Sequence, residues 1–190
     1  CLVPYTFRND DFLFVSFVSV NSYGVVFQHF GFPSFLHFCN GKYECITAIE
    51  PDRRTFRKLC DYLDGIPGST ALQKAVYSED TVLCFSNKAG RQSAVSSKGE
   101  ETEAITVDTL CKNKKVTYLK MDVEGAEEHA LKGAYVTFKS QKPKLNIALY
   151  HRSEDIFKIP LMISEINPEY KFHLRRHPYI PCWDMNLYCI

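Results

Sequence analysis

The stretch Lys120-Met121-Asp122-Val123-Glu124-Gly125-Ala126-Glu127 decides the fold class. It ends an apolar strand predicted over 116–121, and a helix is predicted to begin directly after it. Asp122 and Glu124 therefore lie at the C-terminal edge of a strand, where open α/β sheets bind their ligands. Upstream, Ile46-Thr47-Ala48-Ile49-Glu50-Pro51-Asp52 has the same order of strand, acid and helix. Two acidic strand ends suggest a nucleoside-type cofactor held by carboxylates.

Strand and helix patterns alternate from residue 45 onward. The hydrophobic spacing predicts strands over 45–50, 70–76, 81–85, 103–107, 116–121 and 145–150, and helices over 52–63, 126–140 and 154–165. The 126–140 helix is expected to bury one stripe that includes Tyr135 and Phe138, and Asp108 is expected to cap a brief helix ending at Cys111. Residues 170–177 and 185–190 are predicted to pair as an antiparallel hairpin. The predicted fold is a three-layer α/β sandwich with a mostly parallel sheet.

The first forty residues differ from the rest because they hold nine of the 14 phenylalanines and show no clean period. The apolar run within them, 12–20, is too short to span a membrane, which takes about 20 residues. It also lacks the basic start and the cleavage site of a signal peptide. With 190 residues, the chain is expected to form one domain over 1–190.

The composition favours a small-molecule ligand. The chain has 23 basic and 22 acidic residues, so no net field attracts nucleic acid or an anionic membrane. Its eight cysteines form no C-x-x-C pair and show no metal-ligand spacing, which favours a reducing compartment, the cytoplasm. No residue is assigned as a metal ligand, and the oligomeric state is left open.

Glu50 is the first candidate for cofactor binding, because a carboxylate at this strand end can accept hydrogen bonds from both hydroxyls of a ribose. Such hydrogen bonds to a charged acceptor are strong. The alternative is a solvated carboxylate that only caps the following helix. Asp52 could cap that helix equally well.

Asp122 and Glu124 are candidates to face both the cofactor and the substrate. Carboxylates there could bind a cofactor amine, orient or deprotonate an acceptor hydroxyl, or hold a divalent metal. The alternative for acids in a first helical turn is stabilisation of the positive helix end, and it accounts for Glu127 and Glu128. It accounts poorly for Asp122, which ends the strand.

His151 follows the apolar run at 145–150, so it is predicted to lie on the same sheet edge. A neutral imidazole there could act as a general base near pH 7. The alternative is a hydrogen-bonded surface or capping histidine. The sequence contains no G-x-G-x-x-G, no G-x-x-x-x-G-K-[ST] and no G-x-S-x-G, which disfavours phosphate-cradling loops and serine hydrolases.

Several separated motifs occur in the order seen in one protein family. They are Ala48-Ile49-Glu50-Pro51-Asp52, Ala75-Val76-Tyr77-Ser78, Val107-Asp108-Thr109-Leu110, the stretch from Tyr118 to Glu127, Ala130-Leu131-Lys132-Gly133-Ala134 and Lys142-Pro143-Lys144-Leu145. Over 41–190 the chain resembles the FkbM family of methyltransferases. The resemblance implies a class I Rossmann-like fold, S-adenosylmethionine as cofactor, and a hydroxyl of a sugar or related small molecule as methyl acceptor.

The same resemblance implies roles for individual residues. Glu50, with Asp52 beside it, would bind the ribose, Ala75 and Val76 would lie near the adenine, and Asp122 with Glu124 would face the reacting end. Asp122 or His151 would orient the acceptor hydroxyl or remove its proton.

Relatives in this family carry a D-x-G-x-x-x-G-D turn about twenty residues before the E-P-D segment. Here the window from Val20 to Gly31 offers Gly24 and Gly31 but no acid. Two further hypotheses therefore stand beside the first: a catalytically inactive methyltransferase-like binding module, in which 1–40 replaces the first strand and loop, and an NAD-dependent oxidoreductase.

Overall fold

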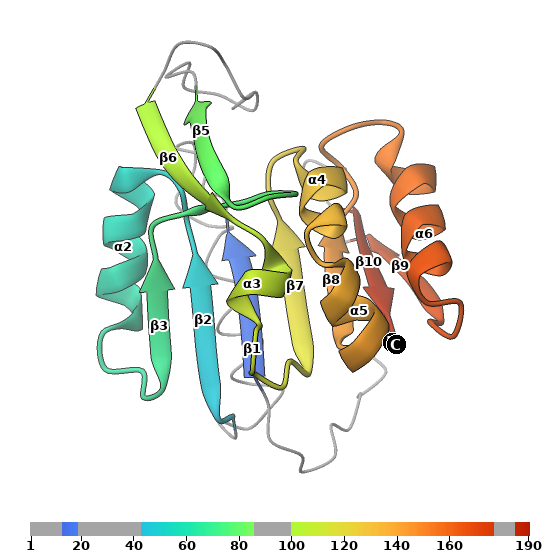
Figure 1. The fold of residues 1–190 in the computed structure, drawn as a ribbon, viewed down its shortest axis with the longest axis horizontal. Helices are drawn as coiled ribbons and strands as arrows, with labels where there is room; N and C mark the ends of the chain where they lie inside the picture. Colours follow the sequence, from blue (N-terminus) through green and yellow to red (C-terminus); the bar gives the residue numbers. More distant parts are fainter. Residues whose placement is uncertain (1–12, 19–42, 86–99, 177–184) are drawn as a thin grey trace.

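Seven strands form the main sheet of the computed structural model, which describes residues 13–18, 43–85, 100–176 and 185–190 (Figure 1). In sheet order they are β3 (Ser69–Leu72), β2 (Cys45–Ile49), β1 (Leu13–Val18), β7 (Tyr118–Asp122), β8 (Lys144–Ala148), β10 (Met185–Cys189) and β9 (Phe172–Arg176). The first five are parallel to one another, and β10 runs antiparallel to both β8 and β9. The mostly parallel sheet and the antiparallel C-terminal hairpin are therefore confirmed.

Helices cover both faces of this sheet. Successive strand residues point to opposite faces, so each face has its own set of side chains to bury. On one face, α2 (Arg53–Leu63) packs through Leu63 against Ile46 and Ala48 of β2. The other face carries the larger core, in which Leu119 and Met121 of β7 belong to one cluster with residues of four helices. Those helices are α3 (Val107–Leu110), α4 (Glu127–Lys132), α5 (Tyr135–Gln141) and α6 (Asp155–Ile166), the last with Pro160 inside it. The three-layer prediction is confirmed.

The strand β1 arises in the N-terminal segment for which no regular element was predicted. Its backbone pairs with β2 on one side and β7 on the other, as in the matches Leu13 with Cys45 and Phe14 with Tyr118. Strands of a parallel sheet need not alternate apolar and polar residues, so the absence of a period gave no signal here. The window from Val20 to Gly31 lies outside the described residues.

The helix predicted over 126–140 is broken at Gly133 into α4 and α5. A side chain at Gly133 would place its Cβ 2.2 Å from the carbonyl oxygen of Tyr77, so only glycine permits this approach. Asp108 lies beside the break, where its carboxylate accepts hydrogen bonds from the backbone of Val136 (3.0 Å) and Thr137 (2.7 Å). The predicted capping role of Asp108 was therefore assigned to the wrong helix. Asp108 accepts from the N–H groups of the first turn of α5, and Thr106 caps α3.

The break also changes which residues of α5 are buried. Tyr135, predicted to lie on the buried stripe, is 47% exposed, whereas Phe138 is fully buried as expected. A continuous helical period does not hold across the break, and Thr137 occupies the buried position instead.

The strand predicted over 70–76 is two strands in two sheets. β3 ends at Leu72, and β4 (Ala75–Val76) joins β6 (Glu100–Ile105) and β5 (Thr81–Phe85) in a small second sheet ordered β4-β6-β5. Lys74 stands at the change of sheet and forms an ion pair with Glu103 of β6. In Figure 1 the β5-β6 hairpin rises above the C-terminal edge of the main sheet.

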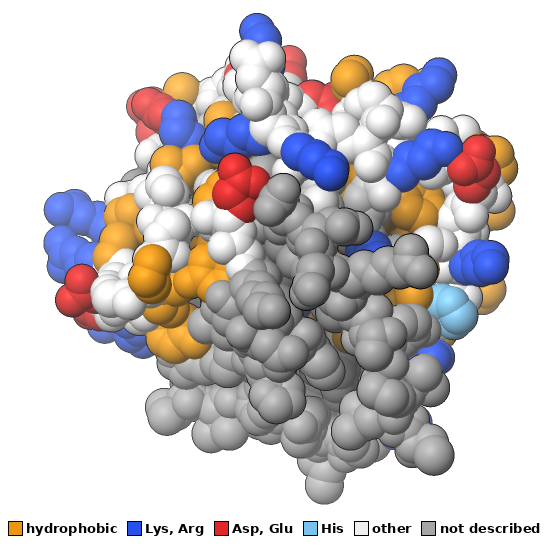
Figure 2. Space-filling view, turned by 90° about the horizontal axis from the view of Figure 1, so that it is seen from below, with side chains coloured by type: hydrophobic (Ala, Val, Ile, Leu, Met, Phe, Trp, Pro, Cys, Tyr) orange, Lys and Arg blue, Asp and Glu red, His pale blue; other side chains and the backbone are white. Residues whose placement is uncertain are grey.

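The charged surface is mixed where it is described. Seen from below, Lys and Arg side chains are interspersed with acidic and apolar ones over the described part of that face (Figure 2). Among the described residues, no helix combines the length and the apolar character that crossing a membrane requires.

The order of the strands places a topological switch point beside β1. From β1 the chain moves to β2 and β3 on one side of it, whereas β7 and β8 lie on the other side. Ligands of open α/β sheets bind at such a reversal, outside the carboxyl ends of the strands. The strand ends that carry Glu50 and Asp122 flank it.

Candidate functional site

Two carboxylates at the end of β2 accept hydrogen bonds from backbone groups within three residues, and the backbone N–H of Glu50 donates to Leu72 of β3 (3.1 Å). Glu50 is fully buried, and its carboxylate accepts a hydrogen bond from the backbone of Asp52 (2.7 Å). Asp52 is the N-cap of α2, because its Oδ1 accepts from the backbone of Thr55 (2.8 Å). The alternative of a solvated Glu50 that caps the helix is therefore wrong: Asp52 caps it, and Glu50 lies beneath the turn.

The end of β7 is a sharp turn that brings two carboxylates back over the sheet edge. Asp122 is the last residue of the strand, and Glu124 and Gly125 follow with φ of 54° and 92°. A non-glycine residue at positive φ is strained, and such strain gathers at functional sites. A Cβ on Gly125 would lie 3.3 Å from Nε of Arg152, so the glycine also lets the next loop approach.

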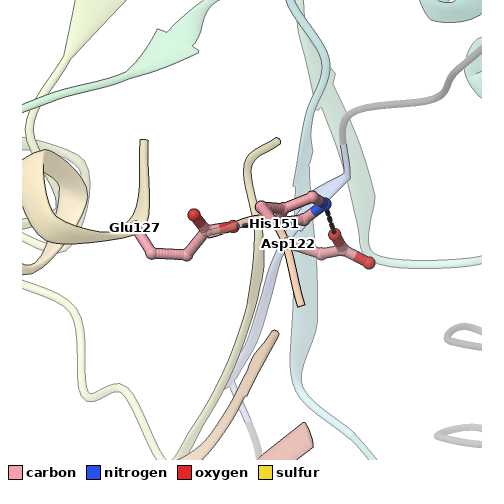
Figure 3. Close-up of side chains that lie close together, drawn as sticks. All are labelled: Asp122, Glu127 and His151. Carbon is pink, nitrogen blue, oxygen red and sulfur yellow. Dashed lines mark hydrogen bonds and ion pairs between the residues drawn. The ribbon is translucent and has the colours of Figure 1, made fainter. Parts of the chain in front are cut away.

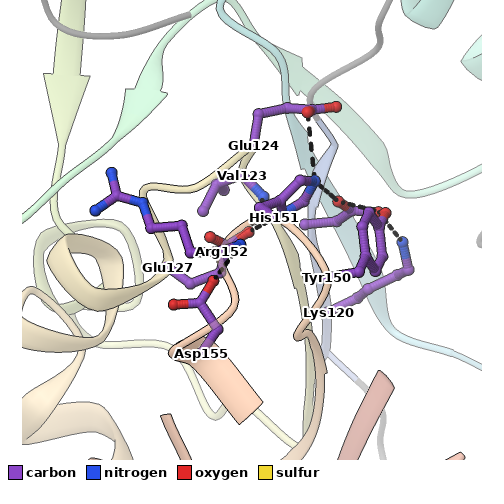
Figure 4. A network of polar contacts seen from close by, with 9 residues as sticks. Lys120, Val123, Glu124, Glu127, Tyr150, His151, Arg152 and Asp155 are labelled. Atoms are coloured by element: carbon purple, nitrogen blue, oxygen red, sulfur yellow. Dashed lines mark hydrogen bonds and ion pairs between the residues drawn. The ribbon is translucent and has the colours of Figure 1, made fainter. Parts of the chain in front are cut away.

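His151 is the centre of this site. It lies in the loop after β8, two residues beyond Leu149. Its Nδ1 lies 2.7 Å from Oε1 of Glu127, and its Nε2 lies 3.3 Å from Glu124 and 3.5 Å from Asp122 (Figures 3 and 4). We call Asp122, Glu124, Glu127 and His151 the His151 cluster. The structure thus brings together three residues that the sequence singled out, and adds Glu127.

The charge state of His151 follows from these neighbours. Burial of the ring opposes the charged form. The hydrogen bonds that the ring donates to Glu124 and Glu127, together with the charges of Glu127 and Asp122, outweigh this effect and raise the pKa of His151 to about 10. Both ring nitrogens then carry protons at neutral pH. A neutral imidazole acting as a base near pH 7, one predicted role of His151, does not fit these surroundings. The other predicted role, orienting the acceptor hydroxyl, does fit them.

Asp122 is held by Lys120 of its own strand β7 and by Tyr150 of the loop after β8. The hydroxyl of Tyr150 donates to Asp122, lying 3.0 Å from Oδ1 and 2.9 Å from Oδ2, and Nζ of Lys120 lies 3.5 Å from Oδ2. Its side chain is still 20% exposed. The aspartate is therefore fixed in place while one part of it faces outward, which suits a group that contacts a ligand.

A further acid, Asp155, lies behind the cluster at the start of α6. Asp155 is buried and accepts a hydrogen bond from the backbone of Arg152 (3.2 Å). Burial and the nearby charge of Glu127 raise the pKa of Asp155 to about 6.

Sequence reasoning missed Glu127, Tyr150 and Asp155 as members of the site. Glu127 was assigned to the positive helix end, and only its buried contact with His151 reveals another role. The signal for Tyr150 was its place beside His151 at a strand end. Asp155 has the sequence context of an ordinary acid in a first helical turn, and only the fold brings it near Glu127.

Ala75 and Val76 belong to the second sheet. Both are buried in β4, where they pair with Ala104 and Ile105 of β6 in the second sheet. Their implied place beside an adenine stays a prediction.

Three members of the His151 cluster offer atoms of the kind that ligate metals. One such atom from each of Asp122, Glu127 and His151 lies within 4.8 Å of the others. In the structure these groups contact one another, with Glu127 against Nδ1 of His151 and Asp122 facing Nε2. The prediction that the site uses no metal ligand stays a prediction.

The sheet order and the acidic strand ends define a class I Rossmann-like fold, the fold of S-adenosylmethionine-dependent methyltransferases. Two solved structures share this fold at low identity. An rRNA methylase from Streptococcus thermophilus matches at 12% identity and a TM-score of 0.51 over 95% of this chain and 86% of that one. A fibrillarin from Aeropyrum pernix, with S-adenosyl-L-methionine natively bound, matches at 10% identity and a TM-score of 0.56 over 96% of this chain and 68% of that one.

The family is shown by a match to the methyltransferase FkbM domain over residues 26–176, and this chain belongs to that family. A methyltransferase FkbM from Methylobacillus flagellatus KT is similar in structure, with 25% identity and a TM-score of 0.75. The match covers 97% of this chain and 44% of that one, so the chain spans less than half the length of that relative. The comparison with curated proteins gives no significant match.

Proposed function

We propose that this chain is an S-adenosylmethionine-dependent methyltransferase that methylates a hydroxyl of a sugar or related small molecule. The observation that carries the proposal is the family match over residues 26–176, which includes both acidic strand ends. The acceptor class comes from the family resemblance. We also propose that residues 1–190 act as one domain.

The donor set fits the cofactor chemically. Glu50 and Asp122 end strands that lie on either side of β1, two strand spacings or about 10 Å apart. S-adenosylmethionine carries ribose hydroxyls and an ammonium group, both of which carboxylates bind through strong hydrogen bonds. When bound, it supplies an electrophilic methyl group. Glu50 would bind the ribose with Asp52 fixing the turn, and Glu124 with Asp122 would face the ammonium and the reacting end.

The residues of the His151 cluster would align the acceptor. Asp122 is the candidate to orient the acceptor hydroxyl or take its proton, since it is anchored by Tyr150 and remains partly exposed. His151, protonated on both nitrogens, would act as a hydrogen-bond donor that orients Asp122 or the acceptor. Alignment of two reactants can supply about 7 to 11 kcal/mol of the barrier in favourable cases.

Thermal shift with S-adenosylmethionine tests the proposal directly. A ligand present at 100 times its Kd stabilises the folded chain by about 2.7 kcal/mol. We expect this shift with the wild-type chain, a weaker affinity with Glu50→Gln, and no change with Glu44→Gln, an exposed glutamate before the other end of β2. Equal affinities of the two variants would remove Glu50 from the site.

The same titration separates the two other hypotheses. An inactive module without a cofactor site would show no shift, and an oxidoreductase would bind NAD more tightly than S-adenosylmethionine. The NAD hypothesis is the weaker one, because the sequence lacks the glycine-rich fingerprint that receives a pyrophosphate at a helix N-terminus.

We further propose that the protein works in the cytoplasm. Cys45, Cys60, Cys84, Cys111 and Cys189 are free thiols, as expected in a reducing compartment. A small-molecule acceptor and no nucleic-acid partner remain our expectation from the balanced charge of the chain.

A further inference from the structure

We propose that Glu127 is the positioning residue of the site, which holds His151 in one orientation and joins the loop after β8 to the turn after β7. Its Oε1 accepts a hydrogen bond from the backbone of Val123 (3.1 Å) and lies 2.7 Å from Nδ1 of His151 (Figure 4). A single carboxylate oxygen therefore ties together the two segments that carry Asp122, Glu124 and His151. A role of these contacts in catalysis rests on the proposed function. The contacts themselves do not depend on it.

The neighbouring glutamate shows that Glu127 does not serve the helix alone. Glu128 is partly exposed and forms ion pairs with Lys132 (2.8 Å) and Lys158 (2.5 Å), as expected for an acid in the first turn of a surface helix. Glu127 is fully buried instead, and its Oε2 has no hydrogen-bond partner among the residues that the structure describes. Burying a carboxylate with one oxygen unsatisfied costs stability, so the helix alone does not explain this residue.

The contact with Glu127 determines how His151 presents its other nitrogen. The hydrogen bond made by one ring nitrogen of a histidine fixes the orientation of the ring and the proton on the other. With Nδ1 donating to Glu127, the proton on Nε2 points toward Glu124 and Asp122. The site then offers a fixed N–H donor beside Asp122, and Asp122 is left as the group able to accept a proton from a hydroxyl.

Charged groups face His151 from every element around it. Asp122 lies on β7, Glu124 in the following turn and Glu127 on α4, while Arg152 follows in the same loop and Asp155 begins α6. Lys120 reaches the far oxygen of Asp122. Of the three acids in contact with the ring, Glu127 is the closest and the most buried, so its charge has the largest influence on the imidazolium.

An NMR titration of the histidine ring protons in the full chain tests the proposal without cofactor or turnover. The His151 signal is assigned as the resonance lost in His151→Gln. In the wild-type chain we expect His151 to stay protonated beyond pH 8. Glu127→Gln keeps the size and the acceptor oxygen but removes the charge, so the His151 pKa should fall by one or more units, a tenfold or larger change in proton affinity. Glu128→Gln should leave it unchanged.

Two outcomes overturn the proposal. One is an unchanged His151 pKa in Glu127→Gln, and the other is a wild-type His151 that titrates at its ordinary value near 6.5. The second needs only the His151→Gln spectrum for assignment, so it decides the matter even if Glu127→Gln does not fold. A wild-type chain that fails to bind S-adenosylmethionine but shows the expected titration would refute the proposed function and leave the role of Glu127 standing.

Discussion

The two acidic strand ends of this sheet are built in opposite ways. At the end of β2, the carboxylates of Glu50 and Asp52 accept backbone hydrogen bonds from residues two and three positions away. At the ends of β7 and β8, contacts join residues 24 and 28 positions apart, Glu127 to His151 and Asp122 to Tyr150. One end is a local turn and helix cap, whereas the other is a buried network that exists only in the folded chain.

This difference separates two tasks within one site. A carboxylate held by hydrogen bonds within its own turn suits the binding of a ligand that every turnover requires. A network across two loops holds several charges in one relative geometry, which suits alignment of reacting groups. The proposed roles follow this division, with Glu50 binding cofactor and Asp122 facing the reaction.

The largest expected effect separates these roles by kinetics. Asp122→Ala should lower kcat at saturating S-adenosylmethionine by about 10² to 10⁴, the usual contribution of a positioned acid or base. Glu50→Gln should instead raise the KM for S-adenosylmethionine and change kcat less. Release of S-adenosylhomocysteine with a panel of monosaccharide acceptors measures both. Undiminished turnover of the Asp122 variant would remove this residue from the mechanism.

The next largest effect is on the free energy of unfolding, and it tests the His151 cluster without any ligand. His151→Gln leaves the carboxylates of Glu124 and Glu127 without their cation, and losing one partner of a buried pair costs about 3 kcal/mol or more. Urea unfolding measures this cost, with His173→Gln on the edge strand β9 as control, expected within about 0.5 kcal/mol of wild type. If both variants cost the same, the network does not stabilise the fold.

The pH dependence of this cost has a definite sign. The pKa of His151 is raised from about 6.5 in the unfolded chain to about 10 in the folded chain. The stabilisation by its charge is therefore fully present below pH 6.5 and is lost as the pH rises through about 10. The gap in stability between wild type and His151→Gln should shrink across that interval. A gap that widens with pH would show that His151 is neutral in the fold.

The same contrast explains what could be predicted from the sequence. Asp52 was recognised as a possible cap because the residue type and the following helix suffice for that inference. The strand ends of Glu50 and Asp122 followed from apolar runs and helix starts. These are properties of short segments, and the fold class follows once several of them are read in order.

Other features depend on partners distant in the chain. Gly133 breaks a helical period because Tyr77, more than fifty residues upstream, approaches its Cα. Asp108 was assigned to its own helix but accepts hydrogen bonds from residues 28 and 29 positions away. Glu127 looks like any acid in a first helical turn until the loop after β8 brings His151 against it. The spacing of residues in the sequence does not indicate such contacts.

The smallest expected effect is the loss of the local cap. Asp52→Ala removes the acceptor for the backbone of Thr55 and should cost about 1 kcal/mol, the usual value of an N-cap. Asp61→Ala, an exposed position within the same helix, should stay within about 0.5 kcal/mol of wild type in urea unfolding. Because Asp52 also donates its backbone N–H to Glu50, the cap variant tests how local this strand end is. A cost near that of His151→Gln would mean that the end of β2 is coupled to the rest of the site, and the contrast between the two ends would no longer hold.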